Sequence, residues 1–547
     1  MKILKFLLNT SRKYLAFSII AGAVAGLCPP GIIALINFKL ESQSSLLTWA
    51  LGSFFFLVIC YGIFSFSSEY AIIKLSQFAL YNLRLTLSKQ ILSSPLRSFE
   101  KTGSHKYFTI LSEDLKYILY TIEGLPGFFV SLGTVFGCLA YMGYLSISLL
   151  FFSVCLTLII LPFSRYAISS AEKSAKKFRL ETDNLYKHFH SLTRGIKDLL
   201  INYNKKRAFL CQQLEPSFKN LKEEHTNVLL MVKFLYRLGE LGAFLILGCI
   251  VFLFPGFSEI DSNSLRGFVL TSLLIIKPAS SLIDFVPRVL QTNISLNHIE
   301  QMGLTPLDTN TSQLPEIIPF SKSQEKFTVV LKDVSHKYYH ADKDENFSLG
   351  PLSLKFEPGE VTFLTGGNGS GKTTLVKLLC GLYTPEEGKV FCENAEVTQD
   401  NIESYRQNFS VTFSDYFLFE NLFWMENSNL KQRVEAYLSK FHLSNKVTIK
   451  DSKFSTIDLS DGQRKRLALL LAFLEDKPFY IFDEWAADQD PIFKNLFYKE
   501  IIWELKKMNK VVLVITHDDS YFDVADRIIK IEEGEIISDK KKSDTSL

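Results

Sequence analysis

The sequence is poor in the residues that build metal and disulfide sites. It contains only 8 Cys and 9 His among 547 residues, and no two cysteines have the C-x-x-C spacing. Most of the cysteines lie in apolar stretches, where a thiol behaves as a small buried hydrophobic group. This pattern argues against a cysteine-based metal site and against a disulfide framework.

The chain also has little net charge. Its formal charge is +3, although it contains 60 basic and 57 acidic side chains. Bulk electrostatics therefore does not recruit a nucleic acid, and none is expected as a partner. Hydrophobic residues make up 47% of the chain and include 47 Phe, which is rich for a soluble enzyme. The length predicts two or more domains.

Charges are absent from several long apolar runs. Tyr14 to Asn37 carries none, and a helix of this length crosses the ~30 Å hydrocarbon core of a bilayer. A cleaved signal peptide would be shorter and would not be followed by further runs of the same kind. The runs predict six membrane spans: Tyr14 to Asn37, Leu46 to Ser68, two within Gly124 to Phe163 joined by a turn at Gly143 to Ser146, Leu241 to Phe257, and Gly267 to Leu290.

Lys and Arg are concentrated between these runs in two blocks, Glu69 to Tyr120 and Arg165 to Glu240. The positive-inside rule places both blocks and both termini in the cytoplasm. The blocks are too long for simple loops and predict helical hairpins that extend beyond the membrane. We expect the hairpins to turn near Leu111 to Leu115 and Leu192 to Ile196, and to touch a cytoplasmic partner there.

Three charges interrupt the sixth span. Lys277, Asp284 and Arg288 fall on roughly one helical face. A charge in the membrane is costly unless it faces protein or water. Lys277 and Asp284 are therefore candidates for the substrate pathway. The alternative for Asp284 is a structural ion pair with Arg288, which the residues favour.

A glycine-rich segment fits the phosphate-loop pattern G-x-x-x-x-G-K-[ST] at every fixed position. An apolar strand, Val361 to Thr365, precedes the segment, and an apparent helix follows it. The backbone is expected to cradle phosphates, Lys372 to reach the β- and γ-phosphates, and the Thr373 hydroxyl to bind magnesium. The predicted phosphate-contacting residues are Gly366, Gly367, Asn368, Gly369, Ser370, Gly371, Lys372, Thr373 and Thr374.

Two further apolar strands end in polar residues. Phe479 to Asp483 is followed by Glu484, and Val511 to Ile515 is followed by Thr516 and His517. Asp483 is predicted to hold the magnesium, Glu484 to polarise the attacking water, and His517 to contact the γ-phosphate.

Two features outside the loop also suggest nucleotide contacts. An aromatic residue before the loop, Tyr338 or alternatively Tyr339, can stack on adenine. Ser460 caps an amphipathic helix that includes Gly462 and Gln463. A helix N-terminus is a phosphate site, and one ATP does not need two of them from one subunit. We therefore expect each ATP to lie between the loop of one subunit and the Ser460 helix of another.

Together these segments resemble the nucleotide-binding domain of ABC transporters, and the whole chain is similar to an exporter-type half-transporter. Gly366 to Thr374 matches Walker A, Phe479 to Glu484 Walker B, Leu459 to Gln463 the signature, Ala487 to Asp490 the D-loop, and His517 the switch histidine. The resemblance implies an all-α six-helix membrane domain of the domain-swapped type I/IV exporter kind, fused to an α/β P-loop ATPase domain. We place the membrane domain at 1–302, a linker at 303–325 and the ATPase domain at 326–547.

The family further implies a dimer, either a homodimer or a heterodimer with an unseen half, that binds ATP and Mg²⁺ and switches between inward- and outward-facing states. Two positions depart from the family pattern. Ser414 stands where a magnesium-contacting Gln is usual, and Asp461 replaces a signature Gly. The Ser414 hydroxyl reaches magnesium and water less directly than a Gln side chain would. We therefore expect this departure to affect the coupling of hydrolysis to transport, and not nucleotide binding.

Within the ATPase domain, the segment Glu484 to Pro491 resembles the bacterial cyclic-peptide and siderophore exporter group, which includes a lasso-peptide exporter. This similarity implies a peptide-like substrate and the bacterial inner membrane. A lipid or multidrug exporter of the same fold is the alternative, and a non-transporting ATP-gated regulator is a third.

Overall fold

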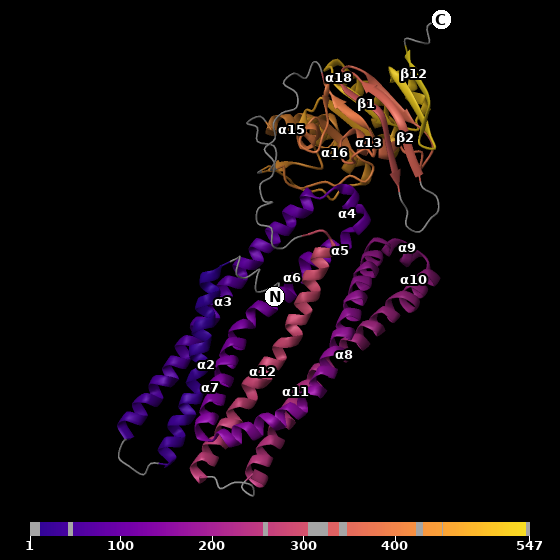
Figure 1. The fold of residues 1–547 in the computed structure, drawn as a ribbon. Helices are drawn as coiled ribbons and strands as arrows, with labels where there is room; N and C mark the ends of the chain where they lie inside the picture. Colours follow the sequence, from indigo (N-terminus) through magenta and orange to yellow (C-terminus); the bar gives the residue numbers. More distant parts are fainter. Residues whose placement is uncertain are drawn as a thin grey trace. The chain divides into compact units, whose positions relative to one another are not determined.

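The computed structural model describes residues 11–41, 47–254, 261–304, 327–338, 347–422, 430–450 and 452–542. The chain forms two compact units, 1–94 with 98–313, and 95–97 with 314–547. The first unit is helical and the second contains the sheets (Figure 1). Each unit is described by itself.

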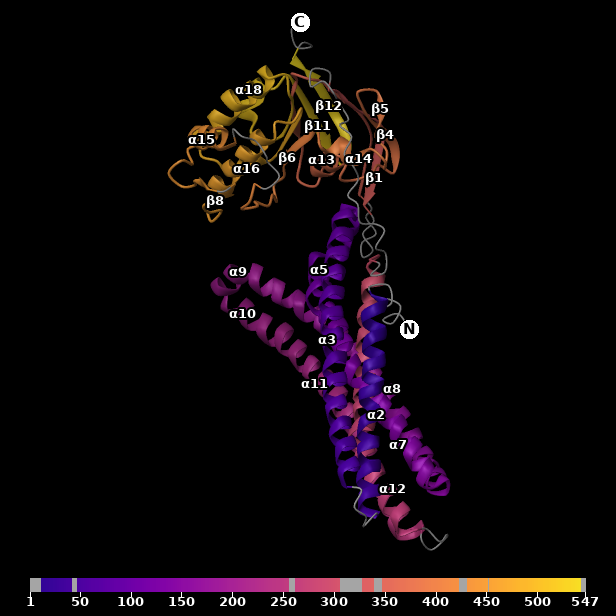
Figure 2. The same ribbon diagram turned by 90° about the vertical axis from the view of Figure 1, so that its left-hand side faces the viewer.

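Long helices make up the first unit. They are α2 (Arg12–Glu41), α3 (Leu47–Ser93), α5 (Ser104–Thr109), η1 (Ile110–Asp114), α6 (Leu115–Glu123), α7 (Leu125–Leu145), α8 (Ile147–Arg194), α9 (Ile196–Ile201), α10 (Tyr203–Phe209), η2 (Leu210–Leu214), α11 (Glu215–Gly248), η3 (Cys249–Leu253) and α12 (Ser262–Gln301). Helices α2, α3, α7 and α12 pack together, while α8 and α11 pair with each other and diverge from them toward α9 and α10 (Figure 2).

Among the described residues, five helical runs are long and apolar enough to cross a membrane: Arg12–Leu40, Trp49–Ser93, Lys106–Leu145, Tyr203–Leu253 and Ser262–Gln301. They account for five of the six predicted spans. The remaining span coincides with the beginning of α8, where Ile147–Leu158 forms a shorter apolar stretch. Many side chains between 159 and 171 lie outside the described part.

Helices α2 and α7 approach so closely that only glycine fits between them. A Cβ on Gly26 would lie 2.3 Å from the carbonyl oxygen of Val130, and one on Gly133 would lie 2.8 Å from that of Ala23. Small residues allow this backbone contact where hydrophobic burial cannot drive helix association. Polar side chains join other helices: Ser18 and Ser68 Oγ atoms lie 2.9 Å apart, and Thr121 and Thr292 Oγ1 atoms 2.8 Å apart.

A buried ionic cluster connects three helical segments of the first unit. Asp114 is fully buried, and its Oδ2 accepts hydrogen bonds from Arg179 (2.7 Å) and His298 Nδ1 (2.8 Å). Asp114 ends the π-helical turn η1, whereas its partners lie on α8 and α12. The prediction that the first hairpin turns at Leu111 to Leu115 is therefore wrong, because this segment is held inside the bundle.

The first hairpin instead turns between α3 and α5, around the short helix α4 (Leu96–Thr102) and Gly103, whose φ is 86°. Pro95 precedes α4 and cannot continue α3. The second predicted turn, Leu192 to Ile196, coincides with the end of α8 at Arg194 and the start of α9.

The second unit is built on a six-stranded sheet in the order β12–β11–β3–β10–β9–β6. These strands are β3 (Val361–Thr365), β6 (Phe409–Thr412), β9 (Phe479–Asp483), β10 (Val511–Ile515), β11 (Arg527–Glu532) and β12 (Glu535–Lys541). All neighbouring pairs are parallel except β11 with β12. Parallel strands bring their carboxyl ends to one edge of the sheet, which is where ligands bind in open α/β sheets.

A four-stranded antiparallel sheet in the order β2–β1–β4–β5 and a short β7–β8 pair complete the strands. They are β1 (Val329–Tyr338), β2 (Phe347–Phe356), β4 (Glu387–Cys392), β5 (Ala395–Glu396), β7 (Ile449–Lys450) and β8 (Lys453–Phe454). The helices are α13 (Lys372–Leu379), α14 (Ile402–Arg406), α15 (Leu430–Lys440), α16 (Asp461–Glu475), η6 (Trp485–Asp488), α17 (Pro491–Asn495), η7 (Leu496–Ile501), α18 (Ile502–Lys507) and η8 (Asp519–Val524).

Alternating residues of the central strands pack into two different cores. Tyr480 and Phe482 of β9 belong to one hydrophobic cluster, and Phe479 and Ile481 to the other. Both faces of the sheet are therefore covered, as the continuous apolar runs of these strands require. The packing of both faces fixes the orientation of each strand and hence the position of the residue at its carboxyl end.

Candidate functional site

Strand β3 and helix α13 hold the predicted phosphate loop between them. Gly366, Gly369 and Gly371 have φ values of 149°, 79° and 103°, which L side chains rarely adopt. A Cβ on Gly366 would lie 2.0 Å from the carbonyl oxygen of Ile531. Only glycine fits, and the unpaired N–H groups of α13 border the loop as an anion site requires.

Lys372, the first residue of α13, is only 6% exposed. Its Nζ donates to the carbonyl oxygens of Gly366 and Gly367, each at 2.9 Å. Burial lowers the pKa of Lys372, and the nearby carboxylates of Glu484 and Asp483 oppose that shift. The ammonium group is therefore held across the loop, where a phosphate would lie.

Ser370 supplies a second indication that the loop fits a polyphosphate. Its side chain is 6% exposed, and its Oγ has no hydrogen-bond partner among the described residues. A buried hydroxyl without a partner is costly. The chemistry of the loop, with free donors and one cation, therefore suits a nucleotide triphosphate.

The oxygen atoms predicted to bind magnesium lie together. Thr373 Oγ1 donates to Asp483 Oδ2 at 3.2 Å. Asp483 ends β9 and is 2% exposed, and its burial raises its pKa, as do Glu484 and Asp415, whereas the bond from Thr373 lowers it. Mg²⁺ is typically held by one or two protein oxygens together with substrate phosphates and water, so this pair fits the ion.

Glu484 and His517 meet at the same edge of the sheet. Asp483 of β9 lies opposite Ile515 of β10 in a parallel register, so the residues that follow both strands are brought together. His517 Nε2 lies 3.4 Å from Glu484 Oε1, and the two side chains are 49% and 39% exposed. Glu484 also has a left-handed backbone, with φ 51°. An accessible carboxylate beside an imidazole can accept a proton from water.

Helix α16 begins with a capping box. Gln463 N–H donates to Ser460 Oγ at 3.5 Å, and Ser460 N–H donates to Gln463 Oε1 at 3.4 Å. Gly462 accepts a hydrogen bond from Gln489 Nε2 at 3.0 Å. Within the described residues, no hydrogen bond or ion pair joins Ser460, Gly462 or Gln463 to the phosphate loop, and Asp461 is exposed.

Three predicted nucleotide residues remain, Ser414, Tyr338 and the alternative Tyr339. Ser414 follows β6, the neighbour of β9, and is exposed. Tyr338 ends β1 but its side chain lies outside the described residues, as does all of Tyr339. Asp415, three residues after β6, is a carboxylate that the sequence analysis did not assign, and its charge adds to the burial that raises the pKa of Asp483.

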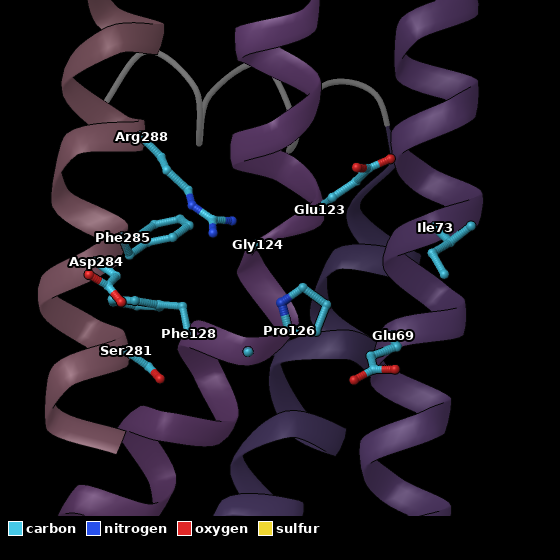
Figure 3. Close-up of a pocket in the computed structure, with 11 residues that line it drawn as sticks. Glu69, Ile73, Glu123, Gly124, Pro126, Phe128, Ser281, Asp284, Phe285 and Arg288 are labelled. Atoms are coloured by element: carbon cyan, nitrogen blue, oxygen red, sulfur yellow. The ribbon is translucent and has the colours of Figure 1, made fainter. Parts of the chain in front are cut away.

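A cavity of 670 Å³ lies in the first unit, between helices α3, α6, α7 and α12 (Figure 3). Asp284 and Arg288 line it, but no ion pair within 4.0 Å joins them among the described residues, so the expected structural pair is wrong. Arg288 instead lies against Gly124, where a Cβ would stand 2.9 Å from its NH1 atom. Lys277 is exposed and does not line this cavity, so its role stays a prediction.

Two family models match this chain. Residues 349–487 match the ABC transporter model, and residues 12–265 match the ABC transporter transmembrane region. The chain is 32% identical over 548 residues to the ATP-binding protein SyrD of Pseudomonas syringae pv. syringae, covering 98% of this chain and 96% of the relative. The chain belongs to the ABC transporter family.

More distant members of the ABC family are also similar. An ATP-dependent lipid A-core flippase of Burkholderia orbicola is 25% identical over 505 residues, covering 88% of this chain and 82% of the relative. The solved structure of a bacterial Atm1-family ABC exporter with ATP bound has the same fold, with a TM-score of 0.78, 14% identity, and coverage of 97% and 96%. The protein is a multi-pass ABC exporter of the inner membrane, a half-transporter that dimerises, binds ATP and couples its hydrolysis to transport.

Proposed function

We propose that this ABC exporter is a homodimer that carries a peptide-like compound, such as a cyclic or modified peptide, out of the bacterial cytoplasm. The similarity of Glu484 to Pro491 to the cyclic-peptide exporter group supports this substrate class. One observation supports the coupling of ATP hydrolysis to export. Thr373 contacts Asp483, and Glu484 contacts His517, at one edge of the sheet.

The proposed dimer binds two ATP molecules. Lys372, Thr373, Asp483, Glu484 and His517 act on the nucleotide of their own subunit, and the Ser460 helix contacts that of the partner. The separation of this helix N-terminus from the phosphate loop within one chain supports the division of roles. Mg²⁺ bound by Thr373 and Asp483 would neutralise charge on the phosphates.

In the membrane, both termini and the helical extensions lie on the cytoplasmic side. The chain divides into a membrane domain, 1–302, a linker, 303–325, and an ATPase domain, 326–547. Lys277 contacts the substrate pathway, and Lys277→Ala is expected to lower the ratio of substrate-stimulated to basal ATP hydrolysis. An equal fall in both rates would assign Lys277 a structural role.

Export of a lipid is the second candidate function, because a relative at 25% identity is described as a lipid A-core flippase. A non-transporting regulator has less support, since that function predicts degenerate catalytic residues, and Lys372, Glu484 and His517 all match the family pattern.

The proposed substrate class is tested with the purified chain in nanodiscs. ATP hydrolysis is measured with increasing concentrations of cyclic peptides, and separately with nanodiscs that contain increasing fractions of anionic or glycosylated lipid. Peptide export predicts saturable stimulation by peptides at constant lipid composition. Stimulation by lipid alone would favour the second function.

A further inference from the structure

The cavity of Figure 3 has an unusual lining for a membrane domain. Its 670 Å³ volume is within the range of small-molecule sites. Three of its lining residues are acidic and one is basic. They are Glu69 on α3, Glu123 on α6, and Asp284 and Arg288 on α12. The lining therefore carries a formal excess of negative charge.

None of the three carboxylates has an ion-pair partner within 4.0 Å in the part of the chain that the structure describes. All three side chains are exposed to the solvent-accessible space around the helices. Asp284 lies within the predicted sixth span, where a charge is rare and costly and commonly marks a transport pathway. Glu69 and Glu123 border the predicted cytoplasmic ends of two other spans and line the same cavity.

The cavity also has an aromatic wall. The rings of Phe128 and Phe285 lie with their centroids 4.8 Å apart and their planes at 34°. Gly124 makes room for this wall, since a Cβ there would stand 3.1 Å from the Phe285 ring and 2.9 Å from Arg288 NH1. Figure 3 shows the Arg288 side chain extending from α12 toward Gly124.

We propose that this cavity recognises the transported compound by a positively charged group, which Glu69, Glu123 and Asp284 contact, and by an apolar group packed on Phe128 and Phe285. This inference rests on the proposed export of a peptide-like compound and makes it more specific. The cargo is a cationic amphipathic molecule with an amine or guanidinium group. An anionic lipid headgroup is disfavoured by the same carboxylates.

The test uses three head-to-tail cyclic hexapeptides of Phe and Leu that differ at one position, which is Lys, Nε-acetyl-Lys or Glu. The full chain is reconstituted in nanodiscs of phosphatidylcholine, so that the lipid contributes no net charge. Binding of dye-labelled peptide is followed by fluorescence anisotropy, and the half-maximal concentration for stimulation of ATP hydrolysis is measured in parallel.

We expect the Lys peptide to act at a concentration about tenfold lower than the acetylated peptide, and the Glu peptide to be the weakest. In the variant E69Q/E123Q/D284N, the Lys and acetylated peptides should differ by less than about twofold. The single variant Asp284→Asn gives an intermediate ratio, and it serves as the second measurement if the triple variant fails to fold. Glu223→Gln, an exposed position on α11 outside the cavity, is the matched control and should keep the full ratio.

The outcomes separate this inference from the proposed function. Equal potency of the Lys and acetylated peptides overturns the cationic site and leaves peptide export intact. A full ratio in the triple variant also overturns the site, as does dissociation of that variant into monomers, which would assign the carboxylates to the dimer contact. Stimulation by lipids with no binding of any peptide overturns the proposed function together with the inference.

Discussion

The two units of this exporter place their large aromatic side chains differently. The membrane unit exposes large aromatic residues, such as Phe66 at 69% and Phe252 at 84%, and buries hydroxyls, such as Ser18 and Thr292. The ATPase unit buries most of its large aromatics, including Trp485 and Phe482, and exposes a few, such as Phe417. This inversion is expected for one unit in lipid and the other in water.

The difference also determines where chemistry can occur. In the ATPase unit, the backbone register of parallel strands brings functional groups to one sheet edge, so a single substitution there should affect the reaction itself. In the membrane unit, a few charged side chains lie among apolar helices. Substitutions of these charges should alter substrate recognition or stability, and not the hydrolysis reaction itself. Four predictions test this contrast, from the largest expected effect to the smallest.

The largest effect is expected for Glu484→Gln. Removing the proposed general base should lower steady-state phosphate release by about a hundredfold or more and leave ATP bound between two subunits. Phosphate release and the fraction of dimer by size-exclusion chromatography measure the two effects. Glu500→Gln, an exposed position on η7, is the control, and unchanged hydrolysis in the Glu484 variant would refute the assigned role.

In the membrane unit, Asp114→Ala should cost about 3 kcal/mol of stability, because it leaves Arg179 buried without its closest carboxylate. Thermal unfolding in detergent measures the loss. The neighbouring Glu113→Gln removes an exposed pair with Lys116 and should cost less than about 1 kcal/mol. Similar losses in both variants would show that the cluster does not contribute as a buried network.

Ser460→Ala should separate capping from nucleotide contact. Loss of the cap of α16 is expected to cost about 1 kcal/mol, with a further fall in hydrolysis if Ser460 contacts the partner's ATP. Ser460→Asn keeps a good capping residue and should restore stability but not hydrolysis. Restoration of both, measured by thermal unfolding and phosphate release, would limit Ser460 to capping.

The smallest effect concerns pH. Burial raises the pKa of Glu475, which accepts a hydrogen bond from Ser410 Oγ at 2.6 Å. A raised pKa in the folded state means that stability is lost as pH rises from below the ordinary value of 4.5 through the folded value. Glu475→Gln should therefore stabilise the protein at pH 8, by about 1 kcal/mol or less, and by a smaller amount at pH 5. An equal gain at both pH values in thermal unfolding would contradict this explanation.

The nucleotide site could largely be predicted from the sequence because its parts are local. The phosphate loop and His517 follow apolar strands and Asp483 ends one, and neighbouring parallel strands must deliver such residues to the same edge. Asp415 was missed because β6 before it is only four residues long and includes the polar residues Ser410 and Thr412, which is a weak signal for a buried strand.

The membrane unit could be predicted only in outline, because its polar residues are paired across long sequence distances. The segment ending at Asp114 has the polar composition of a turn, yet Arg179 and His298 hold it in the bundle. Asp284 and Arg288 have the spacing of a helical ion pair, but the gap over Gly124 accommodates the Arg288 side chain instead. The residues that contact Asp114 and Arg288 are far away in the sequence, so a local pattern does not reveal them.

Trp485 follows Glu484 directly, and its indole N–H donates to the carbonyl oxygen of Lys465 on α16 at 2.8 Å, while its ring packs on Phe497. The helix that begins at Ser460 and the carboxylate of Glu484 are thereby attached to one buried side chain. In the proposed dimer these two groups serve different ATP molecules, so displacement of one shifts the other. Trp485, together with the hydrogen bond from Lys465 Nζ to the Glu484 carbonyl oxygen, would let the two halves of the dimer sense each other's nucleotide state.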